Sequence, residues 1–228
     1  MGAFLEYIVK VSQVRSRILI VAALAALAAC EGSKLAPQVP DGRLPAIAPI
    51  VVALGDSLTS GPGLEPDETY PAILQQRITA NGFPHRVVNA GVSGDTSADA
   101  LRRFDAAVVP DTRVLIVALG ANDGLRGVPV GTLRRNLSTI IEQAKARGIR
   151  VLLCGMETPP TRGFEYSIQF HQVFPDLAAQ YGVPLMPFLL IGVALIPDLN
   201  LEDGFHPNAA GHRRMAENMW PYLEPLLR

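Results

Sequence analysis

The chain has 228 residues, of which 49% are hydrophobic and 18% are charged, and its formal net charge at pH 7 is −1. This composition is typical of an ordinary globular protein and excludes a disordered or collagen-like chain, and two cysteines cannot form the framework of a disulfide-rich protein. The chain also lacks the basic excess with which proteins bind nucleic acid, so no nucleic-acid partner is expected.

The first segment, residues 1–29, is similar to a bacterial signal peptide. Three basic residues, Lys10, Arg15 and Arg17, precede an uncharged run of twelve residues from Ile18 to Ala29. That run is shorter than the roughly 20 apolar residues that a membrane-spanning helix needs, and its length suits the apolar core of a signal peptide. It ends in Leu-Ala-Ala-Cys, which resembles the lipobox of bacterial lipoproteins.

The lipobox resemblance implies that Cys30 carries a lipid and anchors the mature protein to the periplasmic side of a bacterial membrane. Glu31 replaces the aspartate that is associated with inner-membrane retention in enteric bacteria, which favours the outer membrane. The alternative is a signal peptide that is cut nearby, with Cys30 incidental. Residues 30–49 contain four prolines, so they are expected to form a tether, either semi-extended at about 3.1 Å per residue or an ordinary disordered linker.

From residue 50 onward, apolar β-branched runs alternate with amphipathic segments. The apolar runs predict strands at 50–54, 86–89, 114–119, 150–154 and 183–188. The amphipathic segments predict helices at 70–80, 98–109, 133–147, 164–181 and 208–227. Five such alternations predict one domain at 50–228 with three layers, α/β/α, around a five-stranded parallel sheet of the flavodoxin-like order 2-1-3-4-5. Ligands bind such domains at the carboxyl ends of the strands.

Four segments combine polar residues with glycine. They are Gly-Asp-Ser at 55–57, Val-Ser-Gly-Asp-Thr at 92–96, Gly-Ala-Asn-Asp at 120–123 and Asp-Gly-Phe-His-Pro at 203–207. The first three follow predicted strands, where a serine such as Ser57 is commonly a helix cap. In the last segment, Asp203 and His206 are close enough for one turn to hold a carboxylate against an imidazole. A histidine needs that arrangement to act as a base toward a serine.

Together the four segments resemble the four sequence blocks of the SGNH hydrolases, also called GDSL esterases, over nearly all of the chain that follows the tether. The resemblance implies that Ser57 is the nucleophile, His206 the general base and Asp203 the acid that orients the histidine. It also implies an oxyanion hole formed by the backbone amides of Ser57 and Gly94 and the side-chain amide of Asn122.

Longer matches at 88–96, 119–127 and 203–209 are similar to the bacterial periplasmic thioesterase I branch of that superfamily. This similarity implies an arylesterase, acyl-CoA thioesterase or lysophospholipase that acts on a small acyl ester or thioester through an acyl-serine intermediate. It implies neither a metal nor another cofactor. Two alternatives are a carbohydrate O-deacetylase of the same superfamily and a non-catalytic binding lipoprotein.

The same branch implies that the loop at 158–164 shapes the acyl pocket. Leu125, Pro159 and Pro160 are therefore candidate substrate-binding residues, although a plain connection between strand and helix is the alternative for this loop.

Several other polar residues and one cysteine are expected to have structural roles. Asp56 and Asp123 are interpreted as structural hydrogen-bonding groups, and Cys154 as a buried apolar residue of a strand. The three remaining histidines have no partner at ligand spacing and are expected to face solvent: His85, His171 and His212.

Overall fold

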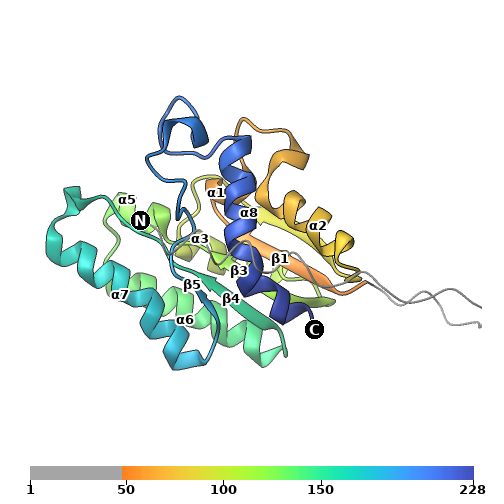
Figure 1. Cartoon of the computed structure of the whole chain (residues 1–228). Coiled ribbons are helices and arrows are strands. Elements are labelled where there is room, and N and C mark those ends of the chain that lie inside the picture. Colours follow the sequence, from red (N-terminus) through yellow and green to blue (C-terminus); the bar gives the residue numbers. More distant parts are fainter. Residues whose placement is uncertain (1–47) are drawn as a thin grey trace, which may run out of the picture. The chain divides into compact units, whose positions relative to one another are not determined.

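The computed structural model describes residues 48–228, apart from the side chain of Pro160 (Figure 1). The predicted signal peptide, the lipidation site Cys30 and nearly all of the predicted tether lie outside the described residues. Among the described residues, no helix has both the length and the apolar character needed to cross a membrane.

Five parallel strands form one sheet in the order β2-β1-β3-β4-β5, which confirms the predicted topology. The strands are β1 (Ile50–Gly55), β2 (Arg86–Gly91), β3 (Thr112–Ala118), β4 (Arg150–Cys154) and β5 (Leu185–Met186). Every residue of β1 is buried, as expected for a central strand with helices on both faces. The fifth strand is shorter than predicted because Pro184 and Pro187 flank it and have no N–H to donate to a neighbouring strand.

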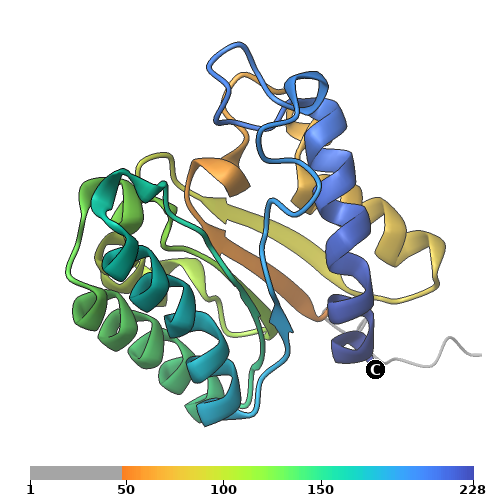
Figure 2. The ribbon, with the colours of Figure 1, turned by 60° about the vertical axis from the view of Figure 1, so that its left-hand side comes forward.

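Helices cover both faces of the sheet and complete the three layers (Figures 1 and 2). They are α1 (Ser57–Ser60), α2 (Tyr70–Ala80), α3 (Ser97–Arg102), α4 (Phe104–Ala107), α5 (Ala121–Arg126), α6 (Val130–Ala146), α7 (Phe164–Tyr181) and α8 (Ala209–Leu223). Helices α2 and α8 pack together on one face, while α3, α6 and α7 lie on the other. The predicted last helix stops at Leu223 and continues as a short 3-10 turn to Leu227, since Pro225 cannot donate a helical hydrogen bond.

The predicted helix at 98–109 is wrong as a single element. The structure divides it into α3 and α4, and Arg103 lies at the junction with φ of −101° and ψ of 11°. The segment contains neither glycine nor proline, so local sequence does not explain the interruption. The side chain of Arg103 instead contacts residues of other elements, which are described below with the candidate active site.

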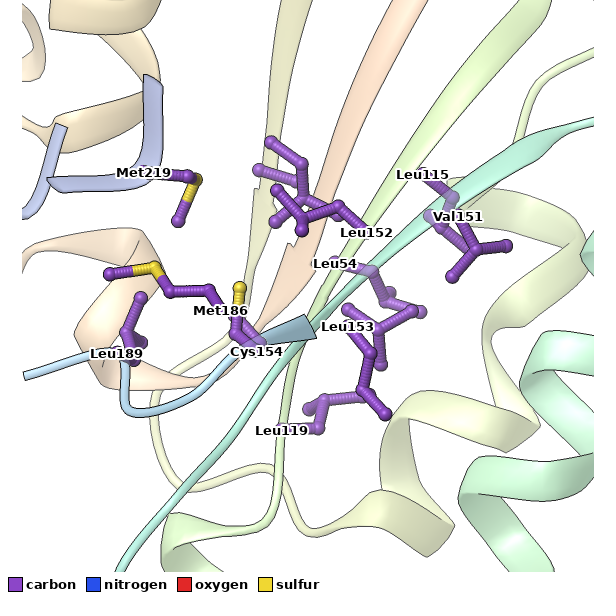
Figure 3. Close-up of a cluster of buried hydrophobic side chains, with 14 of the residues drawn as sticks. Leu54, Leu115, Leu119, Val151, Leu152, Leu153, Cys154, Met186, Leu189 and Met219 are labelled. Carbon is purple, nitrogen blue, oxygen red and sulfur yellow. The ribbon is translucent and has the colours of Figure 1, made fainter. Parts of the chain in front are cut away.

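The core lies between the sheet and the helices. Figure 3 shows part of it, where Cys154 and Met186 lie side by side near Leu189 and Met219. Cys154 is fully buried, as predicted, and burial raises the pKa of its thiol far above the ordinary range. This cysteine is therefore an unreactive part of the core.

Two of the three histidines were predicted wrongly. His171 is exposed and contacts Glu157, but His85 and His212 are buried. The ring of His212 stacks on that of Tyr70, and its Nδ1 accepts a hydrogen bond from the Tyr70 backbone N–H at 3.0 Å. This bond satisfies a donor at the first residue of α2, which explains how α8 can bury a histidine.

Burial lowers the pKa of His212 to about 4, from 6.5 for an exposed histidine. The unfolded chain therefore binds a proton at higher pH than the folded chain, and the free energy of unfolding falls as the pH drops below 6.5. From pH 7.5 to pH 5, His212 should account for a loss of about 2 kcal/mol. Urea denaturation of the wild type and of His212→Asn, which keeps an acceptor for Tyr70, measures this difference. Equal pH dependence in the two proteins would contradict the assignment.

Candidate active site

The four polar segments predicted from the sequence meet at the carboxyl edge of the sheet. Strands β1, β2 and β3 end there, and the segments that follow them begin α1, lead to α3 and begin α5. The fourth segment belongs to the loop that precedes α8, which lies at the same end of the sheet as α1 (Figure 2). Parallel strands place their carboxyl ends at one edge, so residues far apart in sequence become neighbours.

Ser57, His206 and Asp203 form a continuous chain of hydrogen-bonding groups. The Nε2 atom of His206 lies 3.0 Å from the Ser57 Oγ, and its Nδ1 atom lies 2.6 Å from the Asp203 Oδ2. Both distances are those of a serine, base and orienting carboxylate. His206 is therefore held between a hydroxyl group that can lose a proton and a carboxylate that can orient the ring.

The Asp203 carboxylate is fixed by its own turn. Its Oδ1 accepts hydrogen bonds from the backbone N–H groups of Phe205 and His206 at 2.9 and 3.0 Å. The bonds from the backbone and ring of His206 and from the backbone of Phe205 lower the pKa of Asp203 to about 2. The carboxylate is thus ionised at neutral pH and favours His206 with a proton on Nδ1.

Two asparagines that the sequence analysis did not single out hold the loop around His206. Asn200 donates to the carbonyl oxygens of Val193 and Ile196 at 2.8 and 2.7 Å. The Asn208 side chain accepts hydrogen bonds from two N–H groups of the first turn of α8 and so caps that helix. An asparagine at the start of a predicted helix is a signal for a cap, so the sequence offered a way to find Asn208, whereas the partners of Asn200 depend on the fold of the loop.

Ser57 is the first residue of α1, and Asp56 caps that helix by accepting a hydrogen bond from the Leu58 N–H at 3.0 Å. Burial raises the pKa of Asp56 to about 6. Asp123 is also buried and accepts two hydrogen bonds from Ser97, one from its backbone N–H at 2.8 Å and one from its hydroxyl at 2.6 Å. Both carboxyl groups make the structural hydrogen bonds predicted from the sequence.

Gly94 and Asn122 are connected through Asp95. Gly94 has φ of +85°, a conformation that glycine adopts with little strain, and this turn leads directly into Asp95. The Asn122 Nδ2 donates to the Asp95 carbonyl oxygen at 3.0 Å and lies 3.4 Å from the Asp56 Oδ2. The second contact is at the long limit for a hydrogen bond, so one amide hydrogen of Asn122 is only weakly engaged.

Arg103 is a further residue at this edge that sequence reasoning missed. Its Nε donates to the Asp95 Oδ2 at 2.6 Å, and its Nη2 donates to the Gly55 carbonyl oxygen at 3.0 Å. An arginine in an amphipathic helical segment ordinarily lies in solvent, and the sequence contains no local signal that this one turns inward.

The candidate substrate residues lie on two segments that contact each other. Leu125 is half exposed, and its carbonyl oxygen accepts a hydrogen bond from Arg162 in the loop that precedes α7. Pro159 in that loop is partly buried, and the side chain of Pro160 lies outside the described part of the chain. Between residues 48 and 228, the structure brings together no group of three or more histidine, cysteine, aspartate or glutamate side chains that could hold a metal ion.

A family model described as "GDSL-like Lipase/Acylhydrolase family" matches residues 53–214. The chain is 41% identical to "Esterase TesA" of Pseudomonas aeruginosa over 183 residues, which are 80% of this chain and 91% of the relative. It is 35% identical to "Thioesterase 1/protease 1/lysophospholipase L1" of Escherichia coli over 183 residues, which are 80% of this chain and 86% of the relative.

A solved structure described as "Crystal Structure of TesA" superposes with a TM-score of 0.74 at 39% sequence identity and covers 78% of this chain and 99% of that one. The comparison confirms the predicted SGNH hydrolase fold. The chain belongs to the GDSL-like lipase and acylhydrolase family and is a carboxylic ester hydrolase.

Proposed function

We propose that the chain hydrolyses fatty acyl esters and thioesters through an acyl-serine intermediate on Ser57, and that a lipid on Cys30 anchors it at a bacterial membrane. The hydrogen-bonded series of Ser57, His206 and Asp203 is the observation that supports the mechanism. The relatives named as an esterase and as a thioesterase and lysophospholipase support the substrate class.

The first half of the reaction forms the acyl-serine. The Ser57 Oγ attacks the acyl carbonyl carbon while its proton moves to the His206 Nε2, 3.0 Å away. Asp203 stabilises the resulting imidazolium through its contact with Nδ1. His206 then donates the proton to the departing alcohol or thiol. A water molecule then gives a proton to His206 and attacks the acyl carbon. The bond from that carbon to the Ser57 Oγ breaks as His206 returns the proton to Oγ, and the free acid leaves.

Each attack places a negative charge on the former carbonyl oxygen. The backbone amides of Ser57 and Gly94 and the side-chain amide of Asn122 are the proposed donors to that oxygen. The weakly engaged hydrogen of Asn122 is available for this role because only a 3.4 Å contact with Asp56 holds it. A donor of this kind typically contributes about 3 kcal/mol to the stabilisation of the transition state.

The surface around the site favours an apolar acyl group. Among the described residues, the exposed large apolar side chains all lie in loops that follow the carboxyl ends of strands or within the first five residues of the helices that follow them. They are Val92, Leu125, Phe164, Ile168, Ile191, Leu195, Ile196 and Phe205. Exposed apolar groups of this extent commonly mark a binding surface. Their concentration at the catalytic edge supports a fatty acyl substrate in preference to an acetylated sugar.

The proposed anchor follows from the lipobox that ends at Cys30. A tether over residues 30–49 would reach about 60 Å at 3.1 Å per residue if it were polyproline-like throughout. This reach exceeds the diameter of roughly 40 Å that a domain of this length has, so an anchored domain could turn its catalytic edge toward a lipid surface. A periplasmic location is part of this proposal, with the outer membrane favoured by Glu31.

Replacing Ser57 with alanine should lower kcat on a soluble p-nitrophenyl ester at least about 10⁴-fold, since no nucleophile remains. The melting temperature should stay close to that of the wild type. Ser138→Ala changes a serine in the middle of α6 and is the matched control, for which we expect nearly full activity. A folded Ser57→Ala variant with wild-type turnover would exclude the mechanism.

A series of p-nitrophenyl esters from acetyl to palmitoyl tests the acyl preference. Each methylene group that becomes buried contributes about 0.8 kcal/mol, or roughly fourfold in kcat/KM. Partial burial should therefore raise kcat/KM at least about tenfold between acetyl and octanoyl esters. Ser57→Ala supplies the background rate. A preference for the acetyl ester alone would favour the carbohydrate O-deacetylase over the fatty acyl hydrolase.

Lipidation at Cys30 is tested by feeding labelled palmitate to bacteria that express the full chain. The wild type should incorporate the label and sediment with membranes, and Cys30→Ser should do neither. Cys154→Ser is the matched control because Cys154 is the other cysteine of the chain and is buried. Loss of label from Cys154→Ser with retention in Cys30→Ser would refute the anchor.

A further inference from the structure

We propose that Arg103 is a positioning residue for the oxyanion hole. Its guanidinium group holds the Gly94–Asp95 turn against the end of β1, and thereby fixes the amide donors relative to Ser57. The inference rests on the proposed function, because it concerns the geometry of the donors assigned there. Arg103 does not touch the substrate in this proposal and acts through Asp95.

The contacts of Arg103 join two of the segments that form the site. Gly55, whose carbonyl oxygen accepts the Nη2–H bond, is the last residue of β1 and is two residues from Ser57. Asp95, whose carboxylate accepts the Nε–H bond, follows Gly94 directly. The side chains of Arg103 and Asp95 are 23% and 12% exposed, so the ion pair is largely shielded from water.

Asp95 extends this connection to the third segment. Its carbonyl oxygen accepts the 3.0 Å hydrogen bond from Asn122, and its N–H donates to the Val92 carbonyl oxygen at 3.1 Å. One residue thus holds the Gly94 turn through its backbone, the Asn122 carboxamide through its carbonyl oxygen and Arg103 through its carboxylate. A shift of Asp95 would therefore displace two of the three proposed donors, the Gly94 amide and the Asn122 side chain.

The interruption between α3 and α4 supports a specific role for Arg103. Helix breaks ordinarily have a local cause such as proline or glycine, and this segment has neither. The break lies at the residue whose side chain reaches Gly55 and Asp95. Departures from local preference concentrate at functional sites, where tertiary contacts offset their cost.

Of the two basic residues arginine and lysine, only arginine can donate both of these hydrogen bonds with the observed geometry. A guanidinium group is planar and rigid, so its Nε and Nη2 can donate in fixed directions to a carboxylate and to a carbonyl oxygen together. A lysine ammonium group is a single point of charge and cannot reproduce both bonds with the same geometry. The neighbouring Arg102 differs, because it is 70% exposed and contacts Asp99 within its own helix.

Steady-state kinetics on a soluble p-nitrophenyl ester test the proposal in the full chain. Arg103→Met should lower kcat about 10- to 100-fold, less than the loss of a whole oxyanion donor, while KM changes no more than about threefold. Arg103→Lys should recover part of the loss. Arg102→Met is the matched control and should keep kcat within about twofold of the wild type. Asp95→Asn, which keeps the backbone contacts, should resemble Arg103→Met.

A double-mutant cycle separates positioning from a general structural effect. If Arg103 acts through the donors, Arg103→Met should reduce kcat much less in an Asn122→Ala background than in the wild type. Equal reductions in the two backgrounds would overturn the proposal, and so would wild-type kcat in Arg103→Met. If Arg103→Met does not fold, the same cycle is measured with Arg103→Lys or Asp95→Asn in place of Arg103→Met, and the same outcomes support or overturn the proposal. Turnover in Ser57→Ala would instead refute the proposed function.

Discussion

The site depends on the register in which three parallel strands end. Gly55 of β1 is aligned with Gly91 of β2 on one side and with Ala118 of β3 on the other. A Cβ atom at Gly55 would lie 2.0 Å from the Thr59 Oγ1, and one at Gly91 would lie 2.3 Å from the Ser60 backbone nitrogen. Only glycine allows α1 to turn back this closely over the strand ends. The close approach brings the Ser57 turn, the Gly94 turn and the Asn122 turn together.

Both local and long-range contacts hold Ser57, His206 and Asp203 in place. Asp203 and His206 are fixed by bonds within one short turn, which their spacing already suggests. The contact of His206 with Ser57 spans 149 residues and exists only because the loop before α8 returns to the edge of the sheet. Hydrogen bonds of Asn200 and Asn208 hold that loop, so His206, the proposed general base, is positioned by a braced loop rather than by a helix or strand.

Hydrogen bonds among buried polar side chains connect the helices next to the site. Asp123 accepts two bonds from Ser97, whose hydroxyl in turn accepts a bond from Asn136 at 2.9 Å, and the three residues join α5, α3 and α6. Asp56 caps α1 and faces Asn122. Burying carboxyl groups is unfavourable, and hydrogen bonds offset that cost. The resulting network ties the helices that present Ser57 and Asn122 to the layer that packs against the sheet.

The sequence by itself determined the order of strands and helices and the positions of Ser57, Gly94, Asn122, Asp203 and His206 along them. Strands buried on both faces require continuous apolar runs, and a parallel sheet places the segments that follow them at one edge, so local patterns were sufficient for the order of the elements. The five site residues were identified by the resemblance of their four segments to the SGNH sequence blocks. Only the tertiary structure decided the burial of His212 and the inward turn of Arg103. A charged or polar residue on an amphipathic segment is buried only when a distant group supplies its partner. Tyr70, Asp95 and Gly55 supply those partners across the fold, and periodicity within one segment contains no information about them.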